Sequence, residues 1–520
     1  SKDDPVVRTG LLVTQWRVLA VITLLAATLD LFRLSAQPIW FDEVASITAA
    51  RLTLGEFFSS VGSRDAFMYL YEFLLRIPLA FGQSEFAVRS LSVIFAVAAV
   101  PSLYLLGRRL FDDRTAAVTA LLLAVNSLFI DRAQEARSYT LTTLVVIWSW
   151  YTLLNLVERP GWARTTYYSL LTGALAYCHV LSLLMLPAQW AALSVLRPGR
   201  RILKFVAASV LFIGILSVPM TAFMLPAAMS WYGLSYQQTI APRPSKIELQ
   251  EFTLRFVNLP VNVGPLPHFR ILLAVATIVL VALPFAGVAS CMRGMDRKKL
   301  FGYSCGAFSV IFPVAALLIA SFLTPHRYYN LRYIVPSLPF FLLLLAAGLN
   351  EARPAMMKVG FGLLLVANCF GTLEYYRTPT KPDWRSAVEY LMPRIRRDDK
   401  LALIPWQARC SFDYNLSRLS GSLPPSAIVF PLTTGFLVPS STDEMLAAVA
   451  PTYSRLWIIF EDPGPPRNKV PKQILEDLGK RYPYHRRRDF WRLSVFLYAL
   501  KDHETVASAT GDRRRTDPTD

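Results

Sequence analysis

The sequence predicts a polytopic α-helical membrane protein that carries a small C-terminal α/β domain. For the membrane part, 54% of the 520 residues are hydrophobic, and long apolar runs separated by short charged loops extend from about Val18 to Tyr376. A bilayer core is about 30 Å thick and needs about 20 apolar residues per helical crossing, and backbone groups facing lipid must pair within helices. The second domain is predicted because proline, charge and short alternating segments replace the apolar blocks from about Arg377 onward.

About eleven crossings are expected within residues 1–376. They start near Val18, Phe86, Ala116, Ser138, Tyr167, Leu181, Ile202, Ile271, Phe301, Tyr333 and Val359. The segment 167–196 is long for one crossing and short for two. A single crossing would put the basic run 197–201 on the outer side, so a short hairpin is expected.

The distribution of Lys and Arg predicts the orientation in the membrane. The loops expected in the cytoplasm are 1–17, 107–115, 158–166, 196–204, 292–300 and 351–358, with 18 Lys and Arg in 61 residues. The loops expected outside are 38–85, 131–137, 226–270 and 324–332, with 11 in 109. Positive loops stay inside, so the N-terminus is predicted to be cytoplasmic and the C-terminal domain extracytoplasmic. This placement also explains the net charge of +18 without a nucleic-acid partner.

Residues 377–500 are predicted to form the extracytoplasmic α/β domain, and 501–520 to be a disordered polar tail. Short apolar runs predict strands, and they are Leu401–Pro405, Ala427–Pro431, Leu456–Phe460 and Val495–Ala499. Between them, amphipathic periodicity predicts helices over 384–395 and 472–482. This alternation indicates a sheet packed against helices.

The first outer loop carries adjacent carboxylates, Asp42 and Glu43, directly after a membrane crossing. Two interpretations stand side by side. The pair can stabilise the N-terminus of the interfacial helix that follows. It can also supply a general base at the membrane surface, where partial burial raises the pKa of a carboxylate toward neutrality.

Two further outer loops concentrate polar side chains. The second, 131–139, contains Glu135 and Arg137 between apolar helices, and the guanidinium group suits bidentate phosphate binding. A solvated loop is the alternative there. The third loop contains two arginines, a histidine and three tyrosines within nine residues, which suits a phosphate-binding rim; an aromatic belt with snorkelling arginines is the alternative. Its candidate residues are His326, Arg327, Arg332 and Tyr333.

Several other site types are not indicated. No His, Asp and Glu spacing matches a local metal motif, and no P-loop, dinucleotide fingerprint or nucleophile elbow is present. The five cysteines lack a Cys-x-x-Cys spacing and are interpreted as small apolar side chains. His179 lies in an apolar stretch and is interpreted as a hydrogen-bonded interior residue.

Taken in order, these loops resemble the bacterial GT-C membrane glycosyltransferases, in the branch of protein mannosyltransferases and lipid A aminoarabinose transferases. The resemblance covers most of the chain. It rests on Asp42-Glu43, on QSEFAVRSLS from Gln83, on AQEARSYTL from Ala133, on LRYIVPSLPF from Leu331, and on PDWRSAVEYL from Pro382.

Carried over residue by residue, the resemblance implies that Asp42 is the catalytic base, with Glu43 in support. Glu135 would be the acidic residue of the second loop, and Arg332 would help to hold a lipid-linked phosphate. Relatives carry a Pro-Pro-Leu-Tyr-Tyr run where this chain has residues 65–71. Arg64 and Asp65 are therefore site candidates whose roles stay open, as does a requirement for a divalent metal ion.

The sequence thus predicts a membrane glycosyltransferase that moves a sugar from a polyprenyl-phosphate donor to an extracytoplasmic acceptor, with inversion. The acceptor can be lipopolysaccharide, another envelope glycan, a lipid or a protein, and the expected location is the bacterial inner membrane. A transporter or a flippase of lipid-linked glycans is the alternative. Such proteins place ionisable residues at mid-membrane between related halves, whereas the charges here gather in loops.

Overall fold

The computed structural model describes most of the chain. The described residues are 5–59, 68–234, 246–259, 296–324, 328–396, 398–404, 408–419, 428–430, 455–461, 469–482 and 484–500, with isolated positions at 244, 274, 277, 281, 282, 284–289 and 423. Two compact units form. The first, the helical unit, comprises Ser1–Ala36, Ala45–Gly233 and Pro242–Thr380; the second, the α/β unit, comprises Gln37–Val44, Leu234–Ala241 and Lys381–Asp520.

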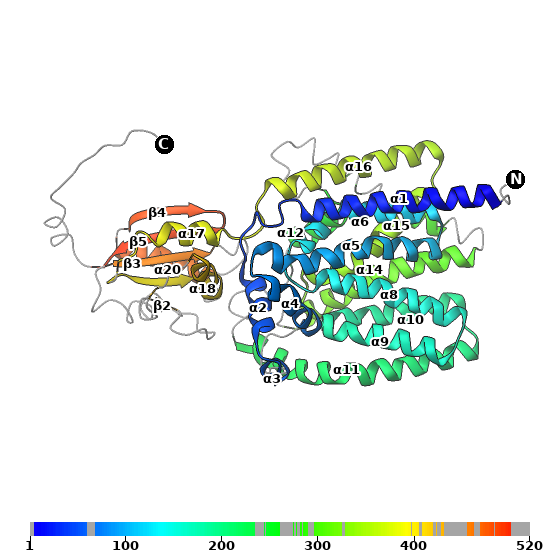
Figure 1. Cartoon of the computed structure of the whole chain (residues 1–520), viewed down its shortest axis with the longest axis horizontal. Helices are drawn as coiled ribbons and strands as arrows, with labels where there is room; N and C mark the ends of the chain where they lie inside the picture. Colours follow the sequence, from blue (N-terminus) through cyan, green and yellow to red (C-terminus); the bar gives the residue numbers. More distant parts are fainter. Residues whose placement is uncertain are drawn as a thin grey trace. The chain divides into compact units, whose positions relative to one another are not determined.

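Helices dominate the chain up to residue 377. They are α1 (Pro5–Leu31), α2 (Phe41–Arg51), α3 (Leu54–Ser59), α4 (Tyr69–Phe81), α5 (Glu85–Leu110), α6 (Asp113–Ala124), α7 (Ser127–Ala133), α8 (Tyr139–Glu158) and α9 (Trp162–Cys178). They continue with η1 (Val180–Leu184), α10 (Met185–Leu196), α11 (Arg200–Leu234), α12 (Lys246–Phe256), α14 (Arg297–Leu323), η2 (Leu331–Ser337), α15 (Leu338–Asn350) and α16 (Pro354–Arg377). The long helices run along a common direction in Figure 1, as a membrane bundle requires.

Seven described helices are long and apolar enough to cross a membrane. The pair α6 and α7, bent by 60°, gives an eighth span if the two helices are counted together. Helices α9 and α10 flank the tight turn at His179, which fits the predicted hairpin. The crossing expected near Ile271 falls largely outside the described residues. The chain is therefore a multi-pass membrane protein, as predicted.

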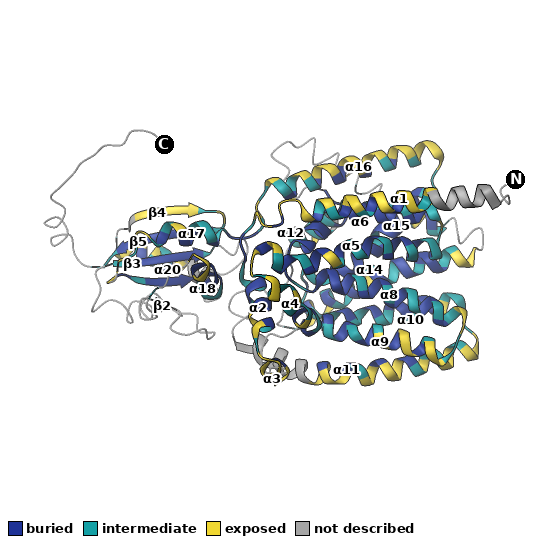
Figure 2. Ribbon diagram, in the orientation of Figure 1, coloured by how far each residue is buried: buried dark blue, intermediate teal, exposed yellow. Residues whose placement is uncertain are grey.

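The interior of the helical unit centres on α5, which packs against α1, α4, α6 and α8. Figure 2 shows α5 largely buried, whereas α11 and α16 carry long exposed stretches. Their exposed side chains are apolar, including Ile215 on α11 and Val359 on α16. An apolar surface of this kind would be unfavourable in water but suits contact with lipid chains.

Two segments expected as loops are partly helical. Within 131–137, the residues up to Ala133 form the last turn of α7, and within 226–270 the chain continues α11 to Leu234 and then forms α12. Polar residues at the end of an apolar run can continue a helix when their side chains form buried hydrogen bonds or ion pairs.

The α/β unit contains a five-stranded sheet. Its elements are α17 (Trp384–Leu391), β1 (Lys400–Ile404), α18 (Ala408–Arg418), β2 (Ile428–Phe430), β3 (Arg455–Glu461), α20 (Lys469–Arg481), β4 (Tyr484–Phe490) and β5 (Leu493–Ala499). The strand order is β2-β1-β3-β5-β4; β1 is parallel to β2 and β3, and β5 is antiparallel to β3 and β4. The predicted small α/β domain is therefore confirmed.

Alternation along the strands builds a core on each face of this sheet. Leu401 and Leu403 of β1 pack with α17 and α18 on one face, and Ala402 and Ile404 pack with α20 on the other. The sequence did not predict α18 or β4. The segment of β4 is polar, with exposed arginines at 486–488, because this edge strand has one neighbour in the sheet and leaves its side chains in water.

Candidate functional site

The polar segment 131–137 begins at the break between α6 and α7. Asn126 caps α7, because its side chain accepts hydrogen bonds from the backbone of Leu128 and Phe129. Asn258, just after α12, accepts from the backbone N–H of Ser127 (2.9 Å) and donates to the carbonyl of Val125 (3.0 Å). Backbone groups freed by a break in a membrane helix need such partners, so these amides hold α7 at its angle.

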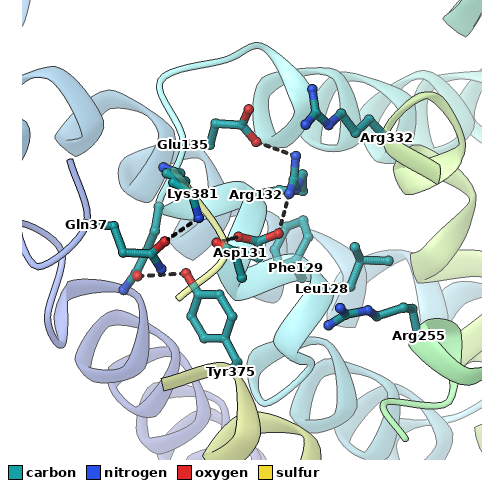
Figure 3. Close-up of polar contacts among 12 residues, drawn as sticks. Gln37, Leu128, Phe129, Asp131, Arg132, Glu135, Arg255, Arg332, Tyr375 and Lys381 are labelled. Atoms are coloured by element: carbon teal, nitrogen blue, oxygen red, sulfur yellow. Dashed lines mark hydrogen bonds and ion pairs between the residues drawn. The ribbon is translucent and has the colours of Figure 1, made fainter. Parts of the chain in front are cut away.

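Helix α7 ends in a buried cluster of charges, shown in Figure 3. Arg132 forms ion pairs with Asp131 and with Glu135. The guanidinium group of Arg332, from η2, points toward the carboxylate of Glu135. Glu135 is fully buried, and its Oε1 has no hydrogen-bond partner among the described residues. The solvated-loop interpretation of this segment is therefore wrong, since Arg132, Gln134 and Glu135 are buried.

The backbone around this cluster is fixed by hydrogen bonds to other helices. Ser92 of α5 donates to the carbonyl of Glu135 (2.7 Å). Gln134 donates to the carbonyl of Asp30 at the end of α1 (2.9 Å), and Tyr375 of α16 donates to Gln134 (2.9 Å). Three helices distant in sequence thus hold the segment. Ser92 belongs to the quoted run from Gln83, and Gln134 belongs to the run from Ala133.

A second polar group surrounds His179, between α9 and η1. Arg137 donates to Ser46 of α2 (3.2 Å), and the rings of His179 and Tyr333 lie 4.9 Å apart. Nδ1 of His179 accepts a hydrogen bond from the backbone N–H of Leu181. Burial and, secondarily, the charge of Arg137 lower the pKa of His179 to about 3. The interpretation of His179 as a buried, hydrogen-bonded histidine agrees with this, but the sequence did not predict that Arg137 and Tyr333 lie beside it.

The acidic pair after the first crossing lies in the first turn of α2, where carboxylates stabilise a helix. Glu43 is buried and forms an ion pair with Lys381 (3.2 Å), a contact within the α/β unit. The backbone of Lys381 also donates to Gln37 (3.0 Å), as Figure 3 shows. Asp42 is partly exposed. Sequence reasoning missed Lys381, although it directly precedes the quoted run from Pro382.

An apolar cavity of about 590 Å³ opens within the helical unit. Its walls come from α3, α4, α9 and α11, and they include Phe57, Tyr69, Gly173, Tyr177 and Met220. The hydrophobic cluster around Phe57 continues to Val180, next to His179. Tyr177 and Val180, which pack against this cluster, flank His179 in the chain.

Four predicted site residues, Arg64, Asp65, His326 and Arg327, lie outside the described residues. Of the others, the structure brings Glu135 and Arg332 to one cluster and Arg137 and Tyr333 to His179. A metal ion has no evident place in the described part of the chain, where no three His, Cys, Asp or Glu side chains group suitably. The carboxylates of Asp131 and Glu135 are already paired with Arg132.

Comparison with known proteins was made with sequences and with structures. Residues 66–229 match the family model of dolichyl-phosphate-mannose-protein mannosyltransferase. No curated protein sequence matches the chain significantly.

Two crystal structures of ArnT from Cupriavidus metallidurans are similar to the chain over 97% of its length and 100% of theirs. The apo form has 13% identity and a TM-score of 0.56, and the form bound to undecaprenyl phosphate has 12% and 0.55. The apo oligosaccharyltransferase of Archaeoglobus fulgidus follows with 12% identity and a TM-score of 0.51, covering 86% of this chain and 69% of its own. The resemblance to the GT-C glycosyltransferases is confirmed, and the chain has their fold.

Proposed function

With the fold of these membrane glycosyltransferases as the premise, we propose that the protein transfers a sugar from a polyprenyl-phosphate donor to an acceptor at the outer face of the bacterial inner membrane. The N-terminus is cytoplasmic and the α/β unit extracytoplasmic in this proposal. The acceptor is an envelope glycan, a lipid or a protein.

The observation that carries this proposal is the cluster of Asp131, Arg132, Glu135 and Arg332, in which Arg132 and Glu135 are buried. Two guanidinium groups share one site, and like charges this close repel each other unless anions lie between them. Glu135 and Asp131 supply part of that negative charge. The phosphate of a lipid-linked donor can supply the rest, since planar guanidinium groups bind phosphate oxygens in pairs.

The cavity beside α9 fits the lipid part of the same donor. Its lining is aliphatic and aromatic. Binding of an isoprenoid chain there removes apolar surface from water, which is favourable, whereas a sugar or a peptide backbone would lose its hydrogen bonds to water. A substrate with a charged head and a long hydrocarbon tail matches a charged cluster and an apolar cavity within one unit.

Asp42 is the proposed base. Its carboxylate accepts the proton of the acceptor hydroxyl while that oxygen forms a bond to the anomeric carbon. The bond from the anomeric carbon to the phosphate oxygen breaks at the same time, and the electron pair leaves with the polyprenyl phosphate. One displacement inverts the anomeric configuration. Cations stabilise the departing phosphate, which needs no proton to leave.

The test is transfer by purified full-length protein in lipid nanodiscs, with synthetic polyprenyl-phosphate sugars and candidate acceptors. Asp42→Asn removes the base and is expected to lower kcat about 100-fold or more, with little change in the KM for the donor. Glu158→Gln makes the same chemical change at an exposed position of a predicted cytoplasmic loop. It should leave kcat within about twofold.

Transfer at the wild-type rate by Asp42→Asn would remove Asp42 from the role of base. Accumulation of lipid-linked sugar across sealed vesicles, with no covalent product under any acceptor, would instead favour the transporter or flippase. Mass spectrometry of the lipid that co-purifies with the protein identifies the donor sugar directly.

A further inference from the structure

We propose that His179, together with Arg137 and Tyr333, extends the phosphate site proposed at Glu135 and Arg332, and that its neutral imidazole donates a hydrogen bond to the phosphate of the polyprenyl-phosphate donor. This inference rests on the proposed function and adds a residue to its site. It concerns a side chain that the sequence alone presents as an interior histidine.

The hydrogen-bond pattern fixes the tautomer of His179. Nδ1 accepts from the backbone N–H of Leu181 at 3.3 Å, so in the neutral ring the proton is on Nε2. The backbone N–H of His179 donates to the carbonyl of Leu175, and its carbonyl accepts from the backbone N–H of Ser182, which holds the residue at the turn. The described residues supply no acceptor for Nε2–H, although His179 is only 7% exposed. An N–H donor in a nearly buried side chain gains a hydrogen bond from a bound anion.

The surroundings of His179 favour an anion over a cation or a proton-transfer role. No described carboxylate contacts the ring, so the orienting acid that accompanies a catalytic histidine base is missing there. The ring meets Tyr333 instead, and the charge that acts on it is that of Arg137. With its pKa near 3 the imidazole stays neutral at physiological pH. It therefore donates a hydrogen bond without adding a second positive charge beside Arg137.

The position of this subsite suits a lipid phosphate. Tyr177 lines the apolar cavity, and Val180 packs on its wall. His179 lies between these two residues in the chain, and the proposal assigns the hydrocarbon tail of the bound lipid to this cavity. Arg137 is held from the other side by Ser46.

The chemistry gives the hydrogen bond a catalytic value. When the bond to the anomeric carbon breaks, the phosphate changes from a diester with one negative charge to a monoester with two. A fixed donor binds the developing dianion more strongly than the ground-state diester. His179 then lowers the barrier as well as binding the donor, and it transfers no proton.

Two substitutions separate this role from a structural one. In His179→Asn the amide oxygen can replace Nδ1 as acceptor for Leu181 but no group replaces Nε2–H. In His179→Gln the amide N–H reaches the position of Nε2. The acceptor that Nδ1 provides for the backbone N–H of Leu181 is lost. The measurement is the Kd for polyprenyl phosphate, the product of the reaction, by calorimetry on full-length protein, with inorganic phosphate alone as a second ligand.

The proposal predicts that His179→Asn weakens polyprenyl-phosphate binding about tenfold or more, as for a lost hydrogen bond to a charged group. His179→Gln should stay within about threefold of wild type, and its kcat should exceed that of His179→Asn. Inorganic phosphate should bind far more weakly to all three proteins, because it leaves the cavity empty.

The reverse order, with His179→Asn binding normally and His179→Gln weakened, would overturn the proposal and make His179 a cap of η1 only. Equal affinity of inorganic and polyprenyl phosphate for the wild type would also contradict it. If His179→Asn does not fold, loss of binding in folded His179→Gln alone overturns it. A wild type that neither binds polyprenyl phosphate nor transfers sugar would instead contradict the proposed function itself.

Discussion

Buried charges at single residues show where this protein departs from an ordinary membrane bundle. Arg132 satisfies two carboxylates at the end of α7, and Lys381 satisfies Glu43 in the α/β unit. Charges buried in pairs are weak evidence for stability, because desolvation offsets their attraction. Glu43 is the member of these pairs whose structural role can be measured separately.

The variant Glu43→Gln leaves the ammonium group of Lys381 buried without its carboxylate. We expect a loss on the order of 3 kcal/mol in local stability, read as faster hydrogen exchange in peptides covering 381–391. Adding Lys381→Met should recover most of the protection, because the buried charge is then absent.

A matched control comes from the exposed pair Arg487 and Asp489 on β4 of the same unit. Asp489→Asn should change hydrogen exchange by the equivalent of less than about 1 kcal/mol. Similar losses from the buried and the exposed pair would mean that Glu43 contributes no more than a surface carboxylate.

At the level of elements, the side chain of Asn258 connects α16 to the break between α6 and α7. Asn258 reaches that break and also donates to the side chain of Asn368 on α16 (2.9 Å). Gly371 of α16 allows this approach, because a Cβ there would lie 2.7 Å from Oδ1 of Asn258 and closer still to its carbonyl oxygen. The position of the charged cluster on α7 thus depends on a glycine far from it in sequence.

Substitution Gly371→Ala is expected to destabilise the protein by about 1–3 kcal/mol through this overlap and to lower transfer activity, since α7 would shift. Gly362→Ala is the control on the same helix, because nothing lies within 4 Å of a Cβ there. Alanine favours a helix over glycine by up to about 1 kcal/mol, so the control should melt at the same temperature or higher.

The comparison is made by thermal melting of both variants in one detergent, followed by the transfer assay. Equal melting temperatures for Gly371→Ala and Gly362→Ala would show that the contact with Asn258 does not constrain α16.

For the whole molecule, the distribution of Lys and Arg predicts which side of the membrane each part faces. Basic residues gather in the loops predicted to be cytoplasmic, and that bias sets orientation. The proposed chemistry depends on this orientation, because the proposed acceptors are assembled outside the cytoplasm.

A phosphatase that is active only outside the cytoplasm, fused after Ala499, should therefore be active, and a green fluorescent protein at the same place should be dark. A fusion after Lys299, in a predicted cytoplasmic loop, should give the opposite pair of signals. An active phosphatase at Lys299 together with an inactive one at Ala499 would reverse the topology and place the proposed reaction in the cytoplasm.

The sequence predicted much of the fold because its signals are local. The apolar runs that start near Phe86, Ser138 and Val359 became α5, α8 and α16, since a bilayer demands helices of that length. The strands near Leu401 and Leu456 followed from their alternation. Polar β4 escaped prediction because an edge strand needs no apolar face.

The sequence by itself determined the membrane class, the α/β domain and the ordered motifs that led to Asp42 and Arg332. Only the tertiary structure decided which charges meet: Glu43 with Lys381, Arg132 with Glu135, and His179 with Tyr333. Hydropathy depends on neighbours in the chain, whereas an ion pair or a ring contact depends on residues 150 or more positions away. The one exception, Arg132 with Glu135, is local in sequence, but the segment that carries it is held by hydrogen bonds to α1, α5 and α16.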